Sequence, residues 1–207
     1  MSTPPPELDP DEAGCRPLLI APPGLEPERL AAALALGGIA GVIVGGGNDR
    51  EEIAAAVARL HPLCREHEVA LLVAGEVELA LELGADGLHL NAAADVSEAR
   101  RRLGLERILG VACGRSRHAA MVAGEDGADY VAFGEPGGAV DEELIELAEW
   151  WSGLFVLPCA VTGAIDREAA ARLARAGADF VGLGETLWHD SDPAVTLRAF
   201  QDTIASV

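Results

Sequence analysis

The stretch "DREAAARLARAGADFVGLG" at residues 166–184 decides the fold. Its first half places apolar residues at steps of three and four, which is the spacing of a helix with one buried face. Gly177 then stands where the end of a helix favours a residue without a Cβ atom. The residues after Asp179 are continuously apolar, as in a parallel strand that is buried on both faces. The stretch therefore predicts a helix that leads directly into a strand.

The phrase at this joint occurs twice more, as "GADGLHL" at 84–90 and "GADYVAFG" at 127–134, and Gly127 suits a helix end as Gly177 does. The whole chain alternates in the same manner. Apolar runs predict eight strands, at 17–21, 39–45, 69–73, 86–90, 107–111, 129–134, 155–161 and 179–184. Helical spacing predicts eight helices, at about 26–36, 49–66, 76–84, 94–103, 116–126, 141–152, 166–176 and 193–205.

Local signals mark the starts of two of these helices. Asp166 and Asp192 are residues that favour the N-cap position, and Pro193 suits the first helical position. Eight strands that alternate with eight helices predict an α/β protein with a (β/α)₈ TIM barrel. A doubly wound open sheet is the alternative. The stretch "GVIVGGGNDR" at 41–50 lacks the G-x-G-x-x-G spacing of a dinucleotide loop, which favours the barrel.

The barrel is expected to form a single domain over residues 16–207. Residues 1–15, "MSTPPPELDPDEAGC", are acidic and rich in proline, and we expect them to form a disordered tail. The tail lacks the basic start and the apolar run of a secretory signal, and no apolar run approaches the roughly 20 residues that cross a bilayer. We therefore expect a cytoplasmic protein. Its four cysteines are widely spaced, which is typical of reduced thiols: Cys15, Cys64, Cys113 and Cys159.

The charge of the chain excludes several classes of function. The net charge is −19, and all 15 basic residues are arginine. Polyanions repel a protein with this much negative charge. We therefore expect neither nucleic acid nor an anionic membrane as a partner. The lack of lysine excludes Schiff-base aldolases, pyridoxal-phosphate enzymes and Walker P-loops.

Barrels place their active sites at the carboxyl ends of the strands, so the residues that follow each strand indicate the function. After the seventh and eighth predicted strands stand Gly163 and Gly184. Glycines there suit a phosphate site in which backbone N–H groups and a helix N-terminus hold the anion. The alternative is that these glycines only form tight turns.

Several of these stretches resemble a known family. The stretches "GADGLHL", "ILGVA", "GADYVAFG" and "VLPCAVTGAIDREAAARLARAGADFVGLGETLW" are together similar to thiamine phosphate synthase and to the related thiazole tautomerase. The resemblance implies a TIM barrel that acts in thiamine biosynthesis. It implies a transferase that joins hydroxymethylpyrimidine diphosphate to thiazole phosphate, with Mg²⁺ and with loss of pyrophosphate.

The resemblance also implies which residues hold the ligands. The phosphorylated ligand would be bound by Gly163 and Ala164 after the seventh strand, and by Gly184, Glu185 and Thr186 after the eighth. Mg²⁺ would be bound by Asp95. The chain departs from the family elsewhere. The cations that hold the diphosphate after the second and sixth strands are missing from "VIVGG" and "EPGG", and Ala74–Gly75 replaces an Asn-Asp pair.

These departures predict weak or altered coupling activity, because a diphosphate carries about three negative charges that need cations. Two alternatives remain open. One is a thiazole-phosphate tautomerase-like proton-transfer enzyme, with His118 or Glu135 as the base. The other is a non-catalytic paralogue that binds thiazole phosphate.

The last candidates follow the fifth predicted strand. Arg115 is a candidate for phosphate binding, and with Arg117 and His118 it would form a cationic, titratable cluster at the barrel mouth. The alternative is a solvated first helical turn. His89 lies inside a strand and is interpreted as a core histidine. Trp150 and its neighbour Trp151 indicate packing or an oligomer contact, and a homodimer is possible on that basis.

Overall fold

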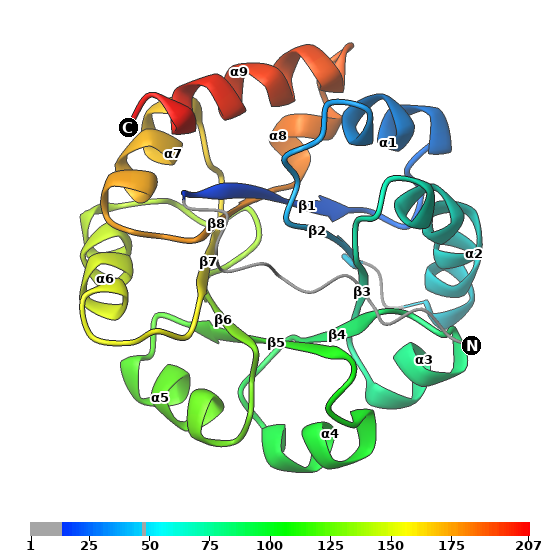
Figure 1. The fold of residues 1–207 in the computed structure, drawn as a ribbon, viewed down its shortest axis with the longest axis horizontal. Coiled ribbons are helices and arrows are strands. Elements are labelled where there is room, and N and C mark those ends of the chain that lie inside the picture. The colour runs from blue at the N-terminus through cyan, green and yellow to red at the C-terminus, as the bar shows by residue number, and fades with distance from the viewer. Residues whose placement is uncertain (1–13, 47–48) are drawn as a thin grey trace.

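The computed structural model describes residues 14–46 and 49–207. Eight parallel strands close in chain order into a barrel, because β1 pairs with β8 as well as with β2 (Figure 1). This closure confirms the TIM barrel and excludes the open sheet. The strands are β1 Arg16–Ala21, β2 Gly41–Val44, β3 Leu71–Ala74, β4 Gly87–Leu90, β5 Ile108–Gly114, β6 Tyr130–Gly134, β7 Cys159–Thr162 and β8 Phe180–Leu183.

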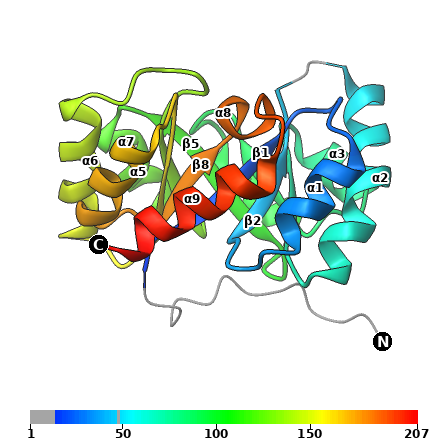
Figure 2. The same ribbon diagram turned by 90° about the horizontal axis from the view of Figure 1, so that it is seen from above.

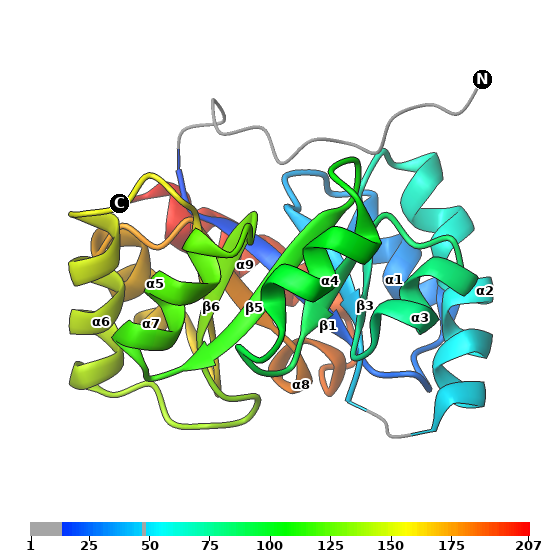
Figure 3. The same cartoon turned by 90° about the horizontal axis from the view of Figure 1, so that it is seen from below.

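The helices form a ring around the barrel, with α9 and α4 on opposite sides (Figures 2 and 3). They are α1 Pro27–Leu34, α2 Arg50–Glu66, α3 Val77–Glu82, α4 Val96–Leu103, α5 Arg117–Glu125, α6 Glu142–Ser152, α7 Arg167–Arg175, α8 Glu185–Trp188 and α9 Pro193–Ala205. All but α8 were expected. In the part of the chain that the structure describes, no helix combines the length and the apolar character that a bilayer crossing requires.

The expected N-caps are present. The Asp166 carboxylate accepts a hydrogen bond from the Ala169 N–H, and that of Asp192 accepts one from Ala194. Residues 1–13 of the expected tail lie outside the described residues, and β1 begins at Arg16.

The repeated Gly-Ala-Asp phrase forms the helix-to-strand joint that the sequence predicts. Gly177 has a φ of +84°, and the Ala178 N–H that follows it donates to the Leu173 carbonyl at 3.1 Å, which ends α7. Asp179 then exchanges two hydrogen bonds with Cys159 of β7. Its N–H donates to the Cys159 carbonyl at 3.0 Å, and its carboxylate accepts the Cys159 N–H at 2.8 Å. The aspartate thus fastens the new strand to the preceding one.

The other two joints have the same bonds. Asp86 joins β4 to Leu71 of β3, and Asp129 joins β6 to Leu109 of β5. The three joints therefore fix strands four, six and eight at the amino end of the barrel, away from the carboxyl ends of the strands.

The core consists of two layers. Apolar side chains from alternate strand positions fill the barrel interior, among them Ile43, Leu72 and Phe180. A larger layer lies between the sheet and the helices. His89 is buried in the interior, 8 % exposed, and its Nδ1 lies 2.9 Å from the Tyr130 hydroxyl, which confirms it as a core histidine with a partner.

The cysteines behave as the spacing predicts. All four are free, and Cys64, Cys113 and Cys159 are buried. Burial raises the pKa of the Cys64 thiol to about 12, so this thiol stays protonated at neutral pH.

Candidate functional site

A cavity of about 570 Å³ opens at the carboxyl ends of the strands, and we call it the mouth cavity. A small organic ligand fits a space of this size. The loops after β1, β2, β6, β7 and β8 supply its wall, together with α1 and α8, so it lies off-centre, toward β1 and β8. Figure 2 shows α8 at this end of the barrel, beside α9 and α1. The residues predicted to bind phosphate at this side all line the cavity: Gly163, Ala164, Gly184, Glu185 and Thr186.

The loops after β6 and β7 touch where the cavity begins. The Ala164 N–H donates to the Gly138 carbonyl at 2.7 Å. A Cβ atom on Gly163 would lie 2.8 Å from that carbonyl oxygen, so only glycine allows the two loops to meet. Close packing therefore accounts for Gly163. A contact between Gly163 and a phosphate stays a prediction.

Helix α8 is fixed to the rim of the barrel. The Gly184 carbonyl accepts the N–H groups of Leu187 and Trp188, at 3.0 and 3.2 Å. The Trp188 indole N–H donates to the Ile20 carbonyl of β1 at 2.7 Å. The first N–H groups of a helix have no partner within the helix, and in α8 they belong to cavity-lining Glu185 and Thr186. The site thus offers backbone donors to an anion.

One arginine lines the cavity, and it is a residue that the sequence did not single out. Arg29 of α1 donates through Nη2 to the carbonyls of Trp188 and Asp190, at 2.7 and 2.5 Å. These partners lie 159 and 161 positions away along the chain. The sequence around Arg29 predicts only a helix, so it does not indicate this contact.

Arg115 lies outside the set of residues that line the cavity and is held by the loop after β6. Its Nη1 donates to Asp141 at 2.7 Å and to Glu143 at 3.2 Å, and its Nη2 donates to the Ala139 carbonyl at 3.1 Å. The hydrogen bond from Arg115 lowers the pKa of the Asp141 carboxyl. Arg115 therefore joins the loop after β5 to the loop that contains cavity residues Pro136 and Gly137.

The structure directs the two arginines of the predicted cluster to different partners. The Arg117 guanidinium lies 4.6 Å from the centre of the Trp150 ring, whereas Arg115 faces the loop after β6. His118 is exposed in the first turn of α5. Trp150 packs against Phe155 at 5.6 Å between ring centres, which confirms its packing role. Glu135 is exposed and directly precedes Pro136 at the cavity wall.

Asp95 is exposed, directly precedes α4 and is not among the residues that line the cavity. Helix α4 lies across the barrel from α9 (Figure 3). Across residues 14–46 and 49–207, no three His, Cys, Asp or Glu side chains gather closely enough to hold a metal ion. The described residues therefore do not fit a magnesium ion that is held by protein ligands alone.

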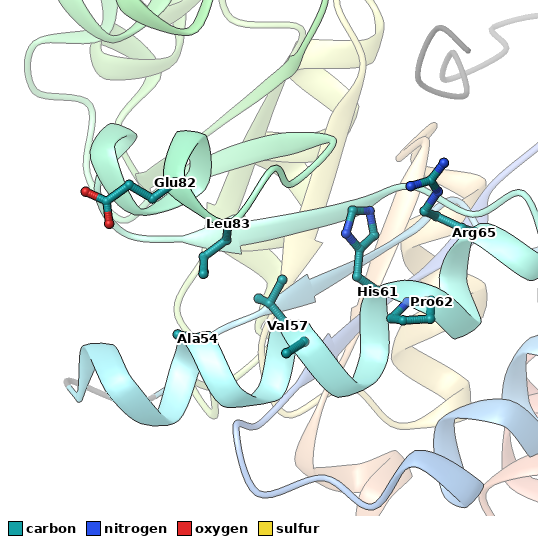
Figure 4. Close-up of a pocket in the computed structure, with 8 residues that line it drawn as sticks. Ala54, Val57, His61, Pro62, Arg65, Glu82 and Leu83 are labelled. Atoms are coloured by element: carbon teal, nitrogen blue, oxygen red, sulfur yellow. The ribbon is translucent and has the colours of Figure 1, made fainter. Parts of the chain in front are cut away.

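A second cavity, of about 530 Å³, lies between α2 and α3 on the outside of the barrel. Figure 4 shows Val57 beneath Leu83, which ends α3, and His61 one turn further along α2 on the same side of the helix. The His61 Nε2 lies 3.1 Å from the Asp86 carboxylate of the joint before β4. The joint before β6 has a comparable partner, since Arg100 pairs with Asp129. The His61–Asp86 pair is therefore explained by the joint.

Comparison with known proteins identifies the family to which the chain belongs. A family model described as thiamine monophosphate synthase matches residues 18–187. A protein of Erythrobacter litoralis named thiamine-phosphate synthase is 39% identical over 193 residues, which cover 87% of this chain and 89% of the relative. A relative of the same name from Rhodospirillum centenum is 39% identical over 201 residues, 90% of this chain and 96% of that one.

Among solved structures, thiamine phosphate pyrophosphorylase from Pyrococcus furiosus superposes with a TM-score of 0.78 at 20% identity, over 92% of this chain and 96% of that chain. At that identity the superposition establishes the barrel fold alone. The family model and the two relatives establish more: this chain belongs to the thiamine monophosphate synthase family.

Proposed function

We propose that this protein binds thiazole phosphate in the mouth cavity and couples it to hydroxymethylpyrimidine diphosphate, as a thiamine-phosphate synthase-like transferase of thiamine biosynthesis. In this reaction the thiazole nitrogen forms a bond to the pyrimidine methylene carbon, and pyrophosphate leaves with the electron pair of the broken C–O bond. One observation carries the proposal. The five residues predicted to hold the phosphate line a single cavity, in a chain that is 39% identical to proteins named thiamine-phosphate synthase.

In this proposal the phosphate binds at the start of α8, where the backbone N–H groups of Gly184, Glu185 and Thr186 and the Thr186 hydroxyl would donate to it. The thiazole ring then extends along Ile20 and Pro22, which line the adjacent wall. The Glu185 side chain is exposed, so water screens its charge from the phosphate.

The diphosphate partner has few charged residues to hold it. The chain contains no lysine, Asp95 lies away from the cavity, and Arg115 is held by the loop after β6. One well-placed donor or cation supplies about 3 kcal/mol or more of transition-state stabilisation, so the loss of several lowers the rate by orders of magnitude. We therefore propose slow coupling. The roles of Asp95, Arg115 and His118 stay predictions.

A second candidate function follows from the same placement. The cavity offers a site for thiazole phosphate on the β8 side, while Asp95, Arg115 and His118 do not line it. This arrangement favours a protein that binds thiazole phosphate without coupling it. Such a protein is either a tautomerase-like enzyme, with Glu135 beside the cavity wall as the base, or a non-catalytic paralogue. We further propose a cytoplasmic location, which the four free cysteines support. A homodimer stays a prediction.

The proposal is tested by incubating the purified protein with both substrates, with and without Mg²⁺, and by measuring thiamine phosphate by chromatography. The control is a relative of the same family that carries the cations missing here after the second and sixth strands, assayed in parallel. We expect product, at a rate at least about 100-fold below that of the relative, because about 3 kcal/mol of charge stabilisation is missing. Binding of thiazole phosphate without any product would favour the second candidate. A rate equal to that of the relative would contradict the argument from missing cations.

A further inference from the structure

Arg29 places a positive charge at the edge of the mouth cavity, and among the described residues no carboxylate pairs with it. None of the ion pairs between described residues includes it. The chain carries 34 acidic residues against 15 arginines, yet no described carboxylate pairs with the partly buried Arg29. In this protein several other arginines pair with carboxylates, as Arg115 does with Asp141.

The bonds that Arg29 does make leave most of its donors unused. Both of its hydrogen bonds to described residues start from Nη2, and they end on the carbonyls of Trp188 and Asp190. A guanidinium has five N–H donors in a planar fork. Among the described residues, Nε and Nη1 therefore have no hydrogen-bond acceptor, and the side chain that bears them lines the cavity.

The Arg29 side chain lines the same cavity as Gly184 and Thr186, where the phosphate is proposed to bind. Trp188 is the last residue of α8, a helix of only four residues whose first residue, Glu185, follows Gly184. Four helical residues span about 6 Å, and residues at both ends of α8 line the same cavity. One edge of Arg29 thus fixes α8, and the other edge is available to a ligand.

We propose that Arg29 recognises the phosphate group of the ligand, through N–H groups on the edge of the guanidinium that does not bind α8. The proposal rests on the proposed function, since it takes thiazole phosphate as the ligand. Planar guanidinium donors suit phosphate oxygens in a bidentate arrangement, which an ammonium group does not reproduce. Arg29 is then the residue that makes the cavity select a phosphate monoester over the corresponding alcohol.

The test compares two ligands, thiazole phosphate and the dephosphorylated thiazole alcohol, by calorimetric titration of Arg29→Gln. Glutamine keeps an N–H donor for the α8 carbonyls and removes the charge. We expect affinity for thiazole phosphate to fall about tenfold or more, the scale of a hydrogen bond to a charged group, and affinity for the alcohol to stay within about twofold. Arg59→Gln is the matched control, because Arg59 likewise donates to a backbone carbonyl beside the cavity, that of Pro23 in the loop after β1 at 2.8 Å, without lining the cavity.

The outcomes separate the possibilities. If Arg29→Gln weakens both ligands by the same factor, Arg29 only supports α8 and the inference is wrong. If the unchanged protein binds neither ligand, the proposed function is wrong and the inference falls with it. If Arg29→Gln does not fold, Arg29→Lys decides. Lysine keeps the charge without the fork, and we expect it to weaken thiazole phosphate at least about threefold, whereas unchanged affinity would contradict the proposal.

Discussion

Replacement of Gly134 by alanine is expected to destabilise the protein by about 3 kcal/mol or more, a fall in the melting temperature of about 6–12 °C for a chain of this length. Gly134 ends β6 with a φ of +84°, where a residue with a Cβ atom is strained. The Cβ atom would also lie 2.1 Å from the Thr162 carbonyl oxygen of β7. A backbone atom cannot rotate away as a side chain does, so the strand ends beneath the cavity must separate.

The control for this prediction is Gly114→Ala. Gly114 ends β5 with a φ of +56°, and nothing lies within 4 Å of its Cβ position. This variant has the backbone strain without the clash and is expected to lose only about 1–2 kcal/mol. Thermal and urea unfolding of both variants provide the measurement. Equal losses in the two variants would show that the contact between β6 and β7 is looser than the structure indicates.

The second large effect is a loss of stability in acid that depends on His89. Burial lowers the pKa of His89 from 6.5 to about 4. The unfolded chain binds a proton at this residue near pH 6.5, and the folded chain does so only near pH 4. Between these values the unfolded state binds more protons, so the free energy of unfolding falls as the pH falls. Over this window the loss from His89 amounts to about 3 kcal/mol.

His89→Gln separates this effect from other acid-sensitive groups. Glutamine does not titrate and offers a polar group to the Tyr130 hydroxyl, so the fall between pH 6.5 and 4 should be smaller by about 3 kcal/mol. Asp86 acts in a lower range. Burial raises the pKa of its carboxyl, but hydrogen bonds from His61 and from the Leu71 N–H outweigh burial and keep the pKa below its usual value of 3.8. Asp86 therefore stabilises the fold above that pH, and its contribution is lost as the pH falls through the folded pKa.

Urea unfolding at a series of pH values is the measurement that checks the histidine. If the unchanged protein and His89→Gln lose stability in parallel from pH 6.5 to 4, His89 is not the group responsible.

The barrel was predictable from the sequence because each of its parts is encoded locally. The joint at Gly177 is predicted by helical spacing, a glycine at the helix end and an apolar run. The helix cap at Asp166 is predicted by the aspartate alone. The bond from Asp179 to β7 was not predictable, because its partner, Cys159, is twenty positions away. Helix α8 has four residues, too few to show a period.

The candidate site was predictable in part for the same reason. Glycines after β7 and β8 indicate a phosphate loop by their type and their position in the fold. Arg29 was missed because its place in the cavity depends on contacts 159 and 161 positions away. Arg115 was recognised as a cation, but its pairing with Asp141 depends on how the loop after β6 folds back.

The measurement that tests the central claim most directly is a calorimetric titration of thiazole phosphate into the unchanged protein and into Ala164→Trp. Ala164 is exposed and lines the cavity, so a tryptophan there fills ligand space without entering the core. Ala164→Ser is the control for the substitution itself. We predict that one thiazole phosphate binds per chain in the unchanged protein and in Ala164→Ser, and that Ala164→Trp loses this binding with an unchanged melting temperature. Absence of binding to the unchanged protein, or equal binding by Ala164→Trp, would contradict the assignment of the phosphate ligand to the mouth cavity.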